Sequence, residues 1–127
     1  MKQPPYGEVT IQTLAMPADT NPNGDIFGGW LVSQMDLAAG VLAKRIAQGR
    51  VVTVAIHSMS FLKPVHVGDV VTCYVHLQKC GTTSMTIGIE VWTQGAAGHE
   101  AYKVTEGIFV FVAVDAAGNS RNLPENI

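Results

Sequence analysis

The chain has 127 residues, of which 47% are apolar and only 14% are charged, and its formal net charge is −2. This length suits a single domain spanning 1–127, and the absence of a Lys/Arg cluster excludes an extended basic surface, so we expect no nucleic-acid partner. The charged fraction lies well below the roughly 25% of an average soluble protein. Because so little of the surface is built for contact with water, we expect a homo-oligomer.

The cysteine count and the N-terminal sequence bear on the compartment. Cys73 and Cys80 lie in a segment with strand periodicity and lack the dense spacing of a disulfide framework, so we expect two buried thiols in a reducing compartment. The N-terminal residues contain no apolar run typical of a secretion signal, and no segment reaches the roughly 18 consecutive apolar residues of a membrane span. We therefore expect a cytoplasmic protein with no membrane partner. The His and Cys residues show no metal-ligand spacing, so no metal site is expected.

The first predicted element is a short strand at about Glu8 to Leu14, which the turn-rich sequence MPADTNPNGD follows. A long helix is predicted next, preceded by Gly28 and Gly29 and ended at Gly49. Apolar residues recur at helical spacing through this segment, at Leu31, Met35, Leu42 and Ile46. Because the helix is apolar almost all round, we expect a strongly curved sheet and a partner subunit to enclose it.

The remaining sequence predicts four strands. The first, VVTVAIHSMSFL, is rich in β-branched residues, and the last, EAYKVTEGIFVFVAVD, ends in the turn-like AAGN. The two middle strands alternate, which places on one face of each the residues Val71, Cys73, Val75 and Leu77, and Met85, Ile87, Ile89 and Val91. The loop QGAAGHE joins the third strand to the fourth. One long helix and strands with tight connections predict an α+β fold, in which an antiparallel sheet covers one face of the helix.

One acidic residue, Asp36, interrupts the apolar helix. On a helical wheel it shares its side with small residues such as Ala39, Gly40 and Ala43. Small side chains leave space for a ligand channel, but they also permit close helix packing, so the wheel favours neither interpretation. The glycine pair adds a second feature, because the N–H groups at a helix start are unpaired and glycine lets a ligand approach them.

Backbone donors and a nearby carboxylate form the minimal apparatus for hydrolysing an acyl compound. The donors would hold the developing oxyanion, and Asp36 would act as general base or as nucleophile. Asp25, in NPNGD, is a second candidate, although it equally fits a turn residue or a helix cap. Because Asp25 precedes the helix by several residues, it need not face the same pocket as its own Asp36 and could face that of a neighbouring subunit.

A series of ordered motifs carries a family resemblance: TLAMPADTNPNGDIFGGW, SQMDLAAG, GRVVTV, FLKPVHVGDVV, GTTSM and EVWTQ. From about Thr13 to Pro124 the chain resembles the YciA-type acyl-CoA thioesterases of the hotdog-fold superfamily. The resemblance implies a single hotdog domain, in which a curved antiparallel β-sheet wraps a long central helix. It also implies that two protomers pair their sheets edge to edge, with active sites at the interface. A homodimer is then the minimal active unit, and a homohexamer, a trimer of dimers, is the expected assembly.

The resemblance further implies hydrolysis of acyl-CoA to a free carboxylic acid and coenzyme A. Asp36 is then the catalytic carboxylate, and the Gly28–Gly29 region polarises the thioester carbonyl. Asp25 occupies a position that is Asn in related thioesterases, where it acts across the interface with the partner's helix acid. An Asp is a weaker hydrogen-bond donor there unless it is protonated. Coenzyme A is part of the substrate and product, so no cofactor is expected.

Substrate contacts are expected in three places. Near the helix start, Asn23 and Phe27 are candidates. In HSMSF, backbone groups around His57, Ser58 and Met59 would line the acyl and pantetheine channel, although a His in a strand is also typical of a structural role. The predicted coenzyme A contacts lie in KCGTTSM, at Lys79, Gly81, Thr82, Thr83 and Ser84, although GTT is also an ordinary hairpin turn; Arg50, Lys63 and Arg121 rank behind them.

Three alternatives remain. Hotdog dehydratases use a His with an acid, but here the residues His57, His66, His76 and His99 lie in strands or loops away from the helix start. Another thioesterase branch carries His before the double glycine, where this chain has Phe27. A non-catalytic acyl-CoA-binding or sensing protein would keep the same pocket without turnover, and the presence of Asp36 argues against it.

Overall fold

The computed structural model describes residues 4–94 and 100–125. In chain order these residues form β1 (Glu8–Leu14), a 3-10 helix η1 (Pro17–Asp19), α1 (Gly28–Ala47), β2 (Val51–Phe61), β3 (Val70–Cys80), β4 (Ser84–Gln94) and β5 (Tyr102–Ala113). The predicted strand before the helix and the four strands after it are all present. No helix within these described ranges has the length and hydropathy needed to cross a membrane.

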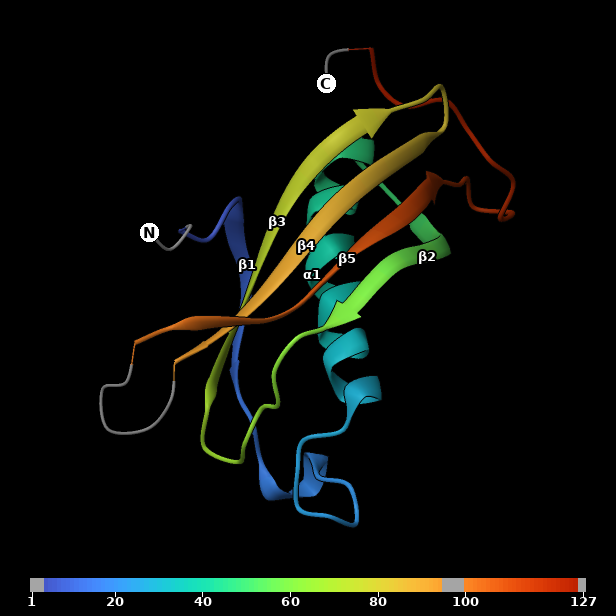
Figure 1. Ribbon diagram of the computed structural model, residues 1–127. Helices are drawn as coiled ribbons and strands as arrows, with labels where there is room; N and C mark the ends of the chain where they lie inside the picture. Colours follow the sequence, from blue (N-terminus) through green and yellow to red (C-terminus); the bar gives the residue numbers. More distant parts are fainter. Residues whose placement is uncertain (1–3, 95–99, 126–127) are drawn as a thin grey trace.

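The five strands form one antiparallel sheet in the order β1-β3-β4-β5-β2. β1 and β2 therefore lie at opposite edges of the sheet, although only the 3-10 helix and α1 separate them in sequence. Figure 1 shows the long sheet curving across α1, which lies along one face and leads the chain from one edge to the other. This arrangement confirms the predicted α+β fold with one helix wrapped by a curved sheet.

The core fills the space between α1 and the sheet. Its helical part is a stripe of buried residues: Leu31, Met35, Ala38, Ala39, Leu42, Ala43 and Ala47. Its sheet part consists of the inward residues of the three central strands: Val71, Cys73, Val75, Met85, Ile87, Ile89, Val91, Phe109 and Phe111. Helical spacing predicted Leu31, Met35 and Leu42 among these residues, and strand alternation predicted those of β3 and β4.

Three local predictions need correction or lie outside the structure. Gly28 and Gly29 are the first two residues of α1 rather than residues before it. Leu77 lies on the predicted face of β3, opposite the buried Ile87, although it is itself 39% exposed near the end of the strand. Cys73 is buried as expected, but Cys80 is exposed where β3 runs into its hairpin. Most of the loop QGAAGHE lies at 95–99, outside the described residues.

The C-terminal end of α1 is held by Arg121, a residue ranked as a minor candidate for coenzyme A contact. Gln48 ends the helix in the left-handed conformation, with φ of 55°. The Arg121 guanidinium donates from Nη2 to the Ala47 carbonyl at 2.8 Å and from Nε to the Val114 carbonyl at 3.2 Å. A Cβ on Gly49 would lie 2.7 Å from Nη2, so glycine leaves room for this contact. The structure thus assigns Arg121 a structural role.

Replacing Arg121 with Ala should lower the free energy of unfolding by about 1–3 kcal/mol, because two backbone acceptors lose a charged donor. Urea denaturation measures this change, and the slope should be unchanged. Arg50→Ala is the matched control, since the one side-chain hydrogen bond that Arg50 makes among the described residues, to the Ala116 carbonyl, is 3.5 Å long. That variant should change the unfolding free energy by no more than about 0.5 kcal/mol. Equal effects from the two substitutions would contradict the capping role.

Candidate active site

The loop before α1 is held by hydrogen bonds that centre on Asn21. Its Oδ1 accepts from the backbone N–H groups of Asn23 at 2.9 Å and Asp25 at 3.1 Å, and its own N–H donates to the Asp25 carbonyl at 2.7 Å. The Ile26 N–H donates to the Val65 carbonyl at 3.2 Å. The turn-rich NPNGD sequence thus folds into a locally bonded loop that fixes where the helix starts.

α1 begins at Gly28 without a capping side chain. Phe27 occupies the N-cap position and makes no side-chain cap hydrogen bond. Within the described residues, the N–H groups of Gly28 and Gly29 donate to no backbone or side-chain acceptor. A Cβ on Gly28 would lie 3.3 Å from the Phe61 ring, and one on Gly29 would lie 3.3 Å from the Phe27 ring. The helix start therefore presents two unpaired donors flanked by aromatic rings, with the positive end of the helix dipole behind them.

A cleft of about 440 Å³ opens beside this helix start. Asp25 and Gly28 line it from the helix side, while Phe61 and Lys63 line it from the end of β2 and the loop that follows. Its other lining residues are Asn21, Ile26, Leu31, Leu62, Pro64 and Val65. We call it the helix-start cleft. It brings together Asp25 and Gly28 of the predicted site, and it adds Asn21, a polar residue that sequence reasoning did not single out.

Asp36 lies further along α1 and is partly exposed on the side that faces β2. The Thr53 hydroxyl donates to Asp36 Oδ1 at 2.6 Å. Sequence reasoning missed Thr53, because a Thr in a β-branched strand looks like any other strand residue. The only signal it leaves is its position in GRVVTV, one of the motifs that carry the resemblance. Thr53 holds the carboxylate in a defined orientation and leaves its other oxygen available.

Gly28 and Asp36 are too far apart in one chain to act on the same carbonyl group. Eight residues of α-helix separate them, which corresponds to about 12 Å along the axis. Hydrogen bonds to one oxygen require donors at about 3 Å. Asp36 is also not among the residues that line the helix-start cleft. A single chain therefore holds the two halves of the predicted apparatus at separate positions.

The edge strand β2 lies next to both halves and is open along its free side. Thr53, near its start, contacts Asp36, and Phe61, at its end, lines the helix-start cleft. Between them Val54 and Ile56 are exposed, with 54% and 44% of their surface accessible. A long apolar edge strand is a template for pairing with another chain. The sequence expectation that a partner covers part of the structure has its strongest support here.

The small residues beside Asp36 divide into two groups. Ala39 and Ala43 are fully buried against the sheet, so these two serve close helix packing rather than a channel wall. Gly40 is partly exposed, and a Cβ there would lie 3.8 Å from the Phe111 ring. Of the two interpretations that the helical wheel left open, the structure supports packing for Ala39 and Ala43.

The predicted coenzyme A segment at Lys79–Ser84 forms the β3–β4 hairpin. Figure 1 shows this hairpin at the opposite end of the sheet from the loop that leads into α1. Backbone bonds occupy the hairpin: the Thr82 carbonyl accepts from Leu123, the Thr83 carbonyl accepts from Ala113, and Gly81 donates to the Ser84 carbonyl. Within one chain, the structure does not bring this segment to the helix-start cleft.

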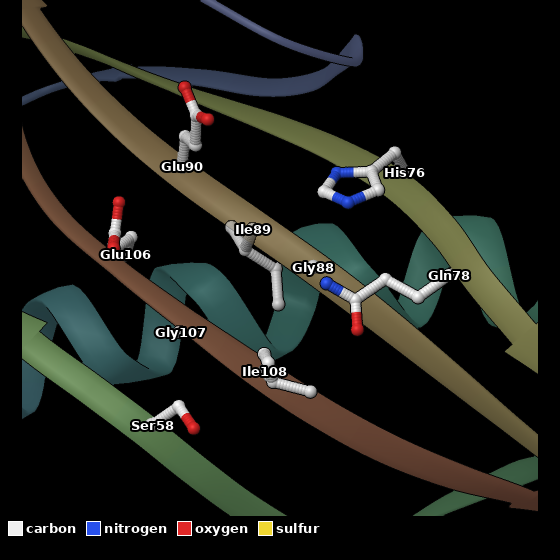
Figure 2. A pocket seen from close by; sticks show the side chains of 9 residues that line it. All are labelled: Ser58, His76, Gln78, Gly88, Ile89, Glu90, Glu106, Gly107 and Ile108. Carbon is white, nitrogen blue, oxygen red and sulfur yellow. The ribbon is translucent and has the colours of Figure 1, made fainter.

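The β2 candidates point to different sides of the sheet. His57 is paired with Ile108, and Ser58 lines a small pocket of about 210 Å³ together with Ile108. Figure 2 shows this pocket on the face of the sheet away from the helix, where His76 and Gln78 extend over the strands. Ser58 has a φ of 55° within a bulge, after which Met59 packs near Gly107 on the helix side. Of the three residues, only Met59 therefore lies on the side of the sheet that α1 covers.

The thiols contribute no nucleophile to this site. Burial raises the pKa of the Cys73 thiol to about 12, so it stays protonated at neutral pH. Cys80 lies at the end of β3 and is not among the residues that line the helix-start cleft. No group of three or more His, Cys, Asp or Glu side chains within the described ranges is arranged to hold a metal ion. The helix-start cleft offers the Asp25 carboxylate, the Lys63 ammonium group and backbone N–H groups.

Comparison with known proteins gives consistent relatives. The Thioesterase superfamily profile matches residues 23–97. The acyl-CoA thioester hydrolase YciA of Salmonella typhimurium is 58% identical over 127 residues, covering 98% of this chain and 96% of the relative. YciA of Escherichia coli is 57% identical over 123 residues, covering 94% and 93%.

Solved structures give the same result. The hexameric thioesterase y2039 from Yersinia pestis is 59% identical with a TM-score of 0.93, covering 96% of this chain and 99% of that one. HI0827, a hexameric broad specificity acyl-coenzyme A thioesterase, is 53% identical with a TM-score of 0.92, covering 98% and 86%. The chain therefore belongs to the thioesterase superfamily, as a hotdog-fold member of the YciA-type acyl-CoA thioesterases.

Proposed function

We propose that this acyl-CoA thioester hydrolase cleaves its substrate at a site shared by two copies of the chain. One copy contributes the helix-start cleft with the N–H groups of Gly28 and Gly29, and the other contributes Asp36. The observation that carries this proposal is the separation of the two halves, about 12 Å along α1, which prevents one chain from supplying both to one carbonyl. The N–H groups of the helix start are unpaired and can donate to a substrate oxygen. The Asp36 carboxylate is oriented by its hydrogen bond with Thr53.

Pairing of two sheets through β2 would bring the halves together. In an antiparallel pair related by a twofold axis, the first half of β2 in one copy lies opposite the second half in the other. Thr53 and the Asp36 that it contacts would then lie near the partner's Phe61, whose ring packs at Gly28. The exposed apolar side chains of β2 supply the contact surface for this pairing. The homodimer is thus the proposed minimal active unit.

The reaction follows from these positions. The thioester carbonyl lies at the helix start, where the two N–H groups stabilise the negative charge that develops on its oxygen. Asp36 takes a proton from water as the water attacks the carbonyl carbon, or it attacks that carbon itself and forms an anhydride that water then opens. In either route the carbon–sulfur bond breaks, the thiolate of coenzyme A takes up a proton, and a free carboxylic acid leaves. Coenzyme A enters as part of the substrate, and the proposal needs no cofactor.

Asp25 and Asn21 are the polar side chains that line the cleft beside the donors. We propose that Asp25 acts across the interface with the partner's Asp36, by orienting the water or the substrate carbonyl. The Asn21 side-chain oxygen already accepts hydrogen bonds from two backbone N–H groups of the loop. Its amide N–H group is therefore the part of the side chain that can donate to a substrate. Hexameric relatives such as y2039 support a trimer of these dimers as the assembly.

A panel of acyl-CoA substrates, with thiol release as the readout, tests both the activity and the role of Thr53. Wild-type protein should release coenzyme A, and Thr53→Val should lower kcat about tenfold, because a hydrogen bond to a charged group is lost. Thr53→Ser is the matched control, since it keeps the hydroxyl and should retain most of kcat. If Thr53→Ser loses as much kcat as Thr53→Val, the hydroxyl does not position Asp36. No thiol release by wild type from any substrate would refute the proposed activity.

A further inference from the structure

Gly107 lies in the middle of β5 and leaves a small space in the core. It pairs with the buried Ile89 of β4, so this position faces α1, which Figure 2 shows behind the sheet. A Cβ at Gly107 would lie 3.0 Å from both Sδ and Cε of Met59 and 3.3 Å from Cε of Met35. Two thioether side chains, one from β2 and one from α1, therefore fill the space that a side chain at this position would take. We call this space the Gly107 niche.

The backbone around Met59 is unusual for an edge strand. Ser58 has a φ of 55°, a left-handed conformation that residues other than glycine seldom adopt, and the register of β2 against β5 shifts there. The hydroxyl of the buried Thr105 donates to the Ser60 carbonyl at 2.5 Å, which fixes the strand just after the shift. The bulge turns the Met59 side chain from the open edge of the sheet into the Gly107 niche.

The two methionines in the niche differ in their freedom to move. Met35 is fully buried on α1, whereas Met59 is only partly buried and reaches the niche from the edge strand. A methionine side chain is unbranched and turns about several bonds, so it adapts to the shape of its surroundings. Met59 is therefore the side chain that can leave the niche while the backbone stays in place.

The helix side of β2 connects the niche with Asp36. Thr53, which donates to Asp36 Oδ1, and Met59 both lie on this side of the strand. Between them, Ile56 pairs with the buried Phe109 and is 44% exposed, so it adds an apolar side chain to the same side. An acyl chain that extends from a carbonyl beside Asp36 along β2 therefore contacts Ile56 before it reaches Met59.

We propose that Met59 determines which acyl lengths the enzyme accepts. With short acyl groups its side chain fills the Gly107 niche, and with longer ones it turns out toward the edge of the sheet while the end of the acyl chain takes its place. Burial of the additional methylene groups in the niche favours the longer substrates, and the glycine leaves the room that they need. This role rests on the proposed function, because the ligand is the acyl group of that reaction.

The dependence of kcat/KM on acyl length tests this role. Met59→Ala leaves the niche open and should raise kcat/KM for octanoyl-CoA relative to acetyl-CoA about tenfold, as expected for burial of about two more methylene groups. Gly107→Ala should lower the same ratio about tenfold, because its Cβ occupies the niche. Met16→Ala is the matched control, since Met16 is 50% exposed just before η1, and it should leave the ratio unchanged.

A second pair of variants separates the niche from a general effect on the core. The double variant Met59→Ala/Gly107→Ala should return the ratio to within about threefold of wild type, because the new methyl group occupies part of the emptied space. Met59→Leu keeps a similar volume, but its branched side chain turns less freely, so it should lower the ratio severalfold. Thermal unfolding shows which variants are folded, and Met59→Leu and Gly107→Ala test the role even if Met59→Ala is not.

Binding of substrate analogues tests the niche without any reaction. The S-octyl and S-methyl thioethers of coenzyme A have no carbonyl group and cannot be hydrolysed. Isothermal titration calorimetry gives the affinity of each variant for both compounds. Met59→Ala should raise the affinity for the octyl thioether relative to the methyl thioether about tenfold, and Gly107→Ala should lower it about tenfold.

An octanoyl-to-acetyl ratio that stays at the wild-type value in folded Met59→Ala and Gly107→Ala would overturn this role and leave the proposed hydrolysis intact. Equal changes in kcat/KM for both substrates would also overturn it, since Met59 would then support the structure rather than select the acyl length. Thioether affinities that depend on Met59 as expected, in a wild-type protein that hydrolyses no acyl-CoA, would support the niche and count against the proposed activity. The two proposals can therefore fail separately.

Discussion

Replacing Asp36 with Asn should lower kcat for acyl-CoA hydrolysis by about 10²–10⁴, the contribution of a positioned general base. The substitution is nearly isosteric, and the amide oxygen can still accept the hydrogen bond that the Thr53 hydroxyl donates to Asp36 Oδ1 at 2.6 Å. What disappears is the group that takes a proton from water or attacks the carbonyl. Thiol release measured at saturating substrate gives kcat directly, and KM should change little because the donors and the cleft remain.

The control for this loss is the same chemical change at a distant position. Asp115 accepts backbone hydrogen bonds from Ala117 and Asn119 in the turn after β5, and Asn can accept the same bonds. Asp115→Asn should therefore have wild-type kcat. Thermal unfolding and size-exclusion chromatography of both variants show whether fold and assembly are kept. Wild-type kcat in Asp36→Asn would remove Asp36 from the mechanism.

Mixing two inactive variants should restore activity if the site spans two copies. Asp25→Ala and Asp36→Ala each impair every site of their own homodimer. A mixed dimer contains one site with both residues intact and one site with neither, because a twofold interface exchanges the two residues between copies. Complete random exchange of equal amounts should therefore recover about a quarter of wild-type kcat per chain. The starting rates of the two separate variants give the baseline.

Subunit exchange has to be measured in the same sample. Native mass spectrometry of one isotopically labelled variant reports the fraction of mixed dimers, and recovered activity should rise in proportion to it. A mixture of wild type with Asp36→Ala is the control, because its subunits exchange but no two inactive chains complement each other. Activity that stays at the baseline in fully exchanged samples would mean that Asp25 and Asp36 do not act in one shared site.

Local patterns predicted most of the fold. The helical stripe that includes Leu31, Met35 and Leu42, and the alternation of Met85, Ile87 and Ile89, are both buried in the structure. Such patterns are readable because they depend on the period of each element and on its nearest neighbours in sequence. The bulge that follows Leu77 in β3 was not predicted, because bulges leave little trace in the sequence.

The candidate site was predictable only in part. Asp36 and the glycine pair stood out because a lone acid and a double glycine are unusual at the start of an apolar helix. Thr53 did not, since its contact with Asp36 joins residues 17 positions apart on different elements. Lys63 was ranked low because nothing in its local sequence indicates that it lines the helix-start cleft.

The sequence by itself determined the elements and the family, because both depend on short spacings and ordered motifs, and it named Asp36 and the glycine pair as candidates for the reaction. The tertiary structure alone decided that β1 and β2 are the open edges, that Ala39 and Ala43 pack into the core, and that Asp36 contacts Thr53 rather than lining the helix-start cleft. These properties depend on which distant segments meet. Only the folded sheet shows that the open edge strand β2 lies beside both the donors and the carboxylate, and hence where a second copy is proposed to complete the site.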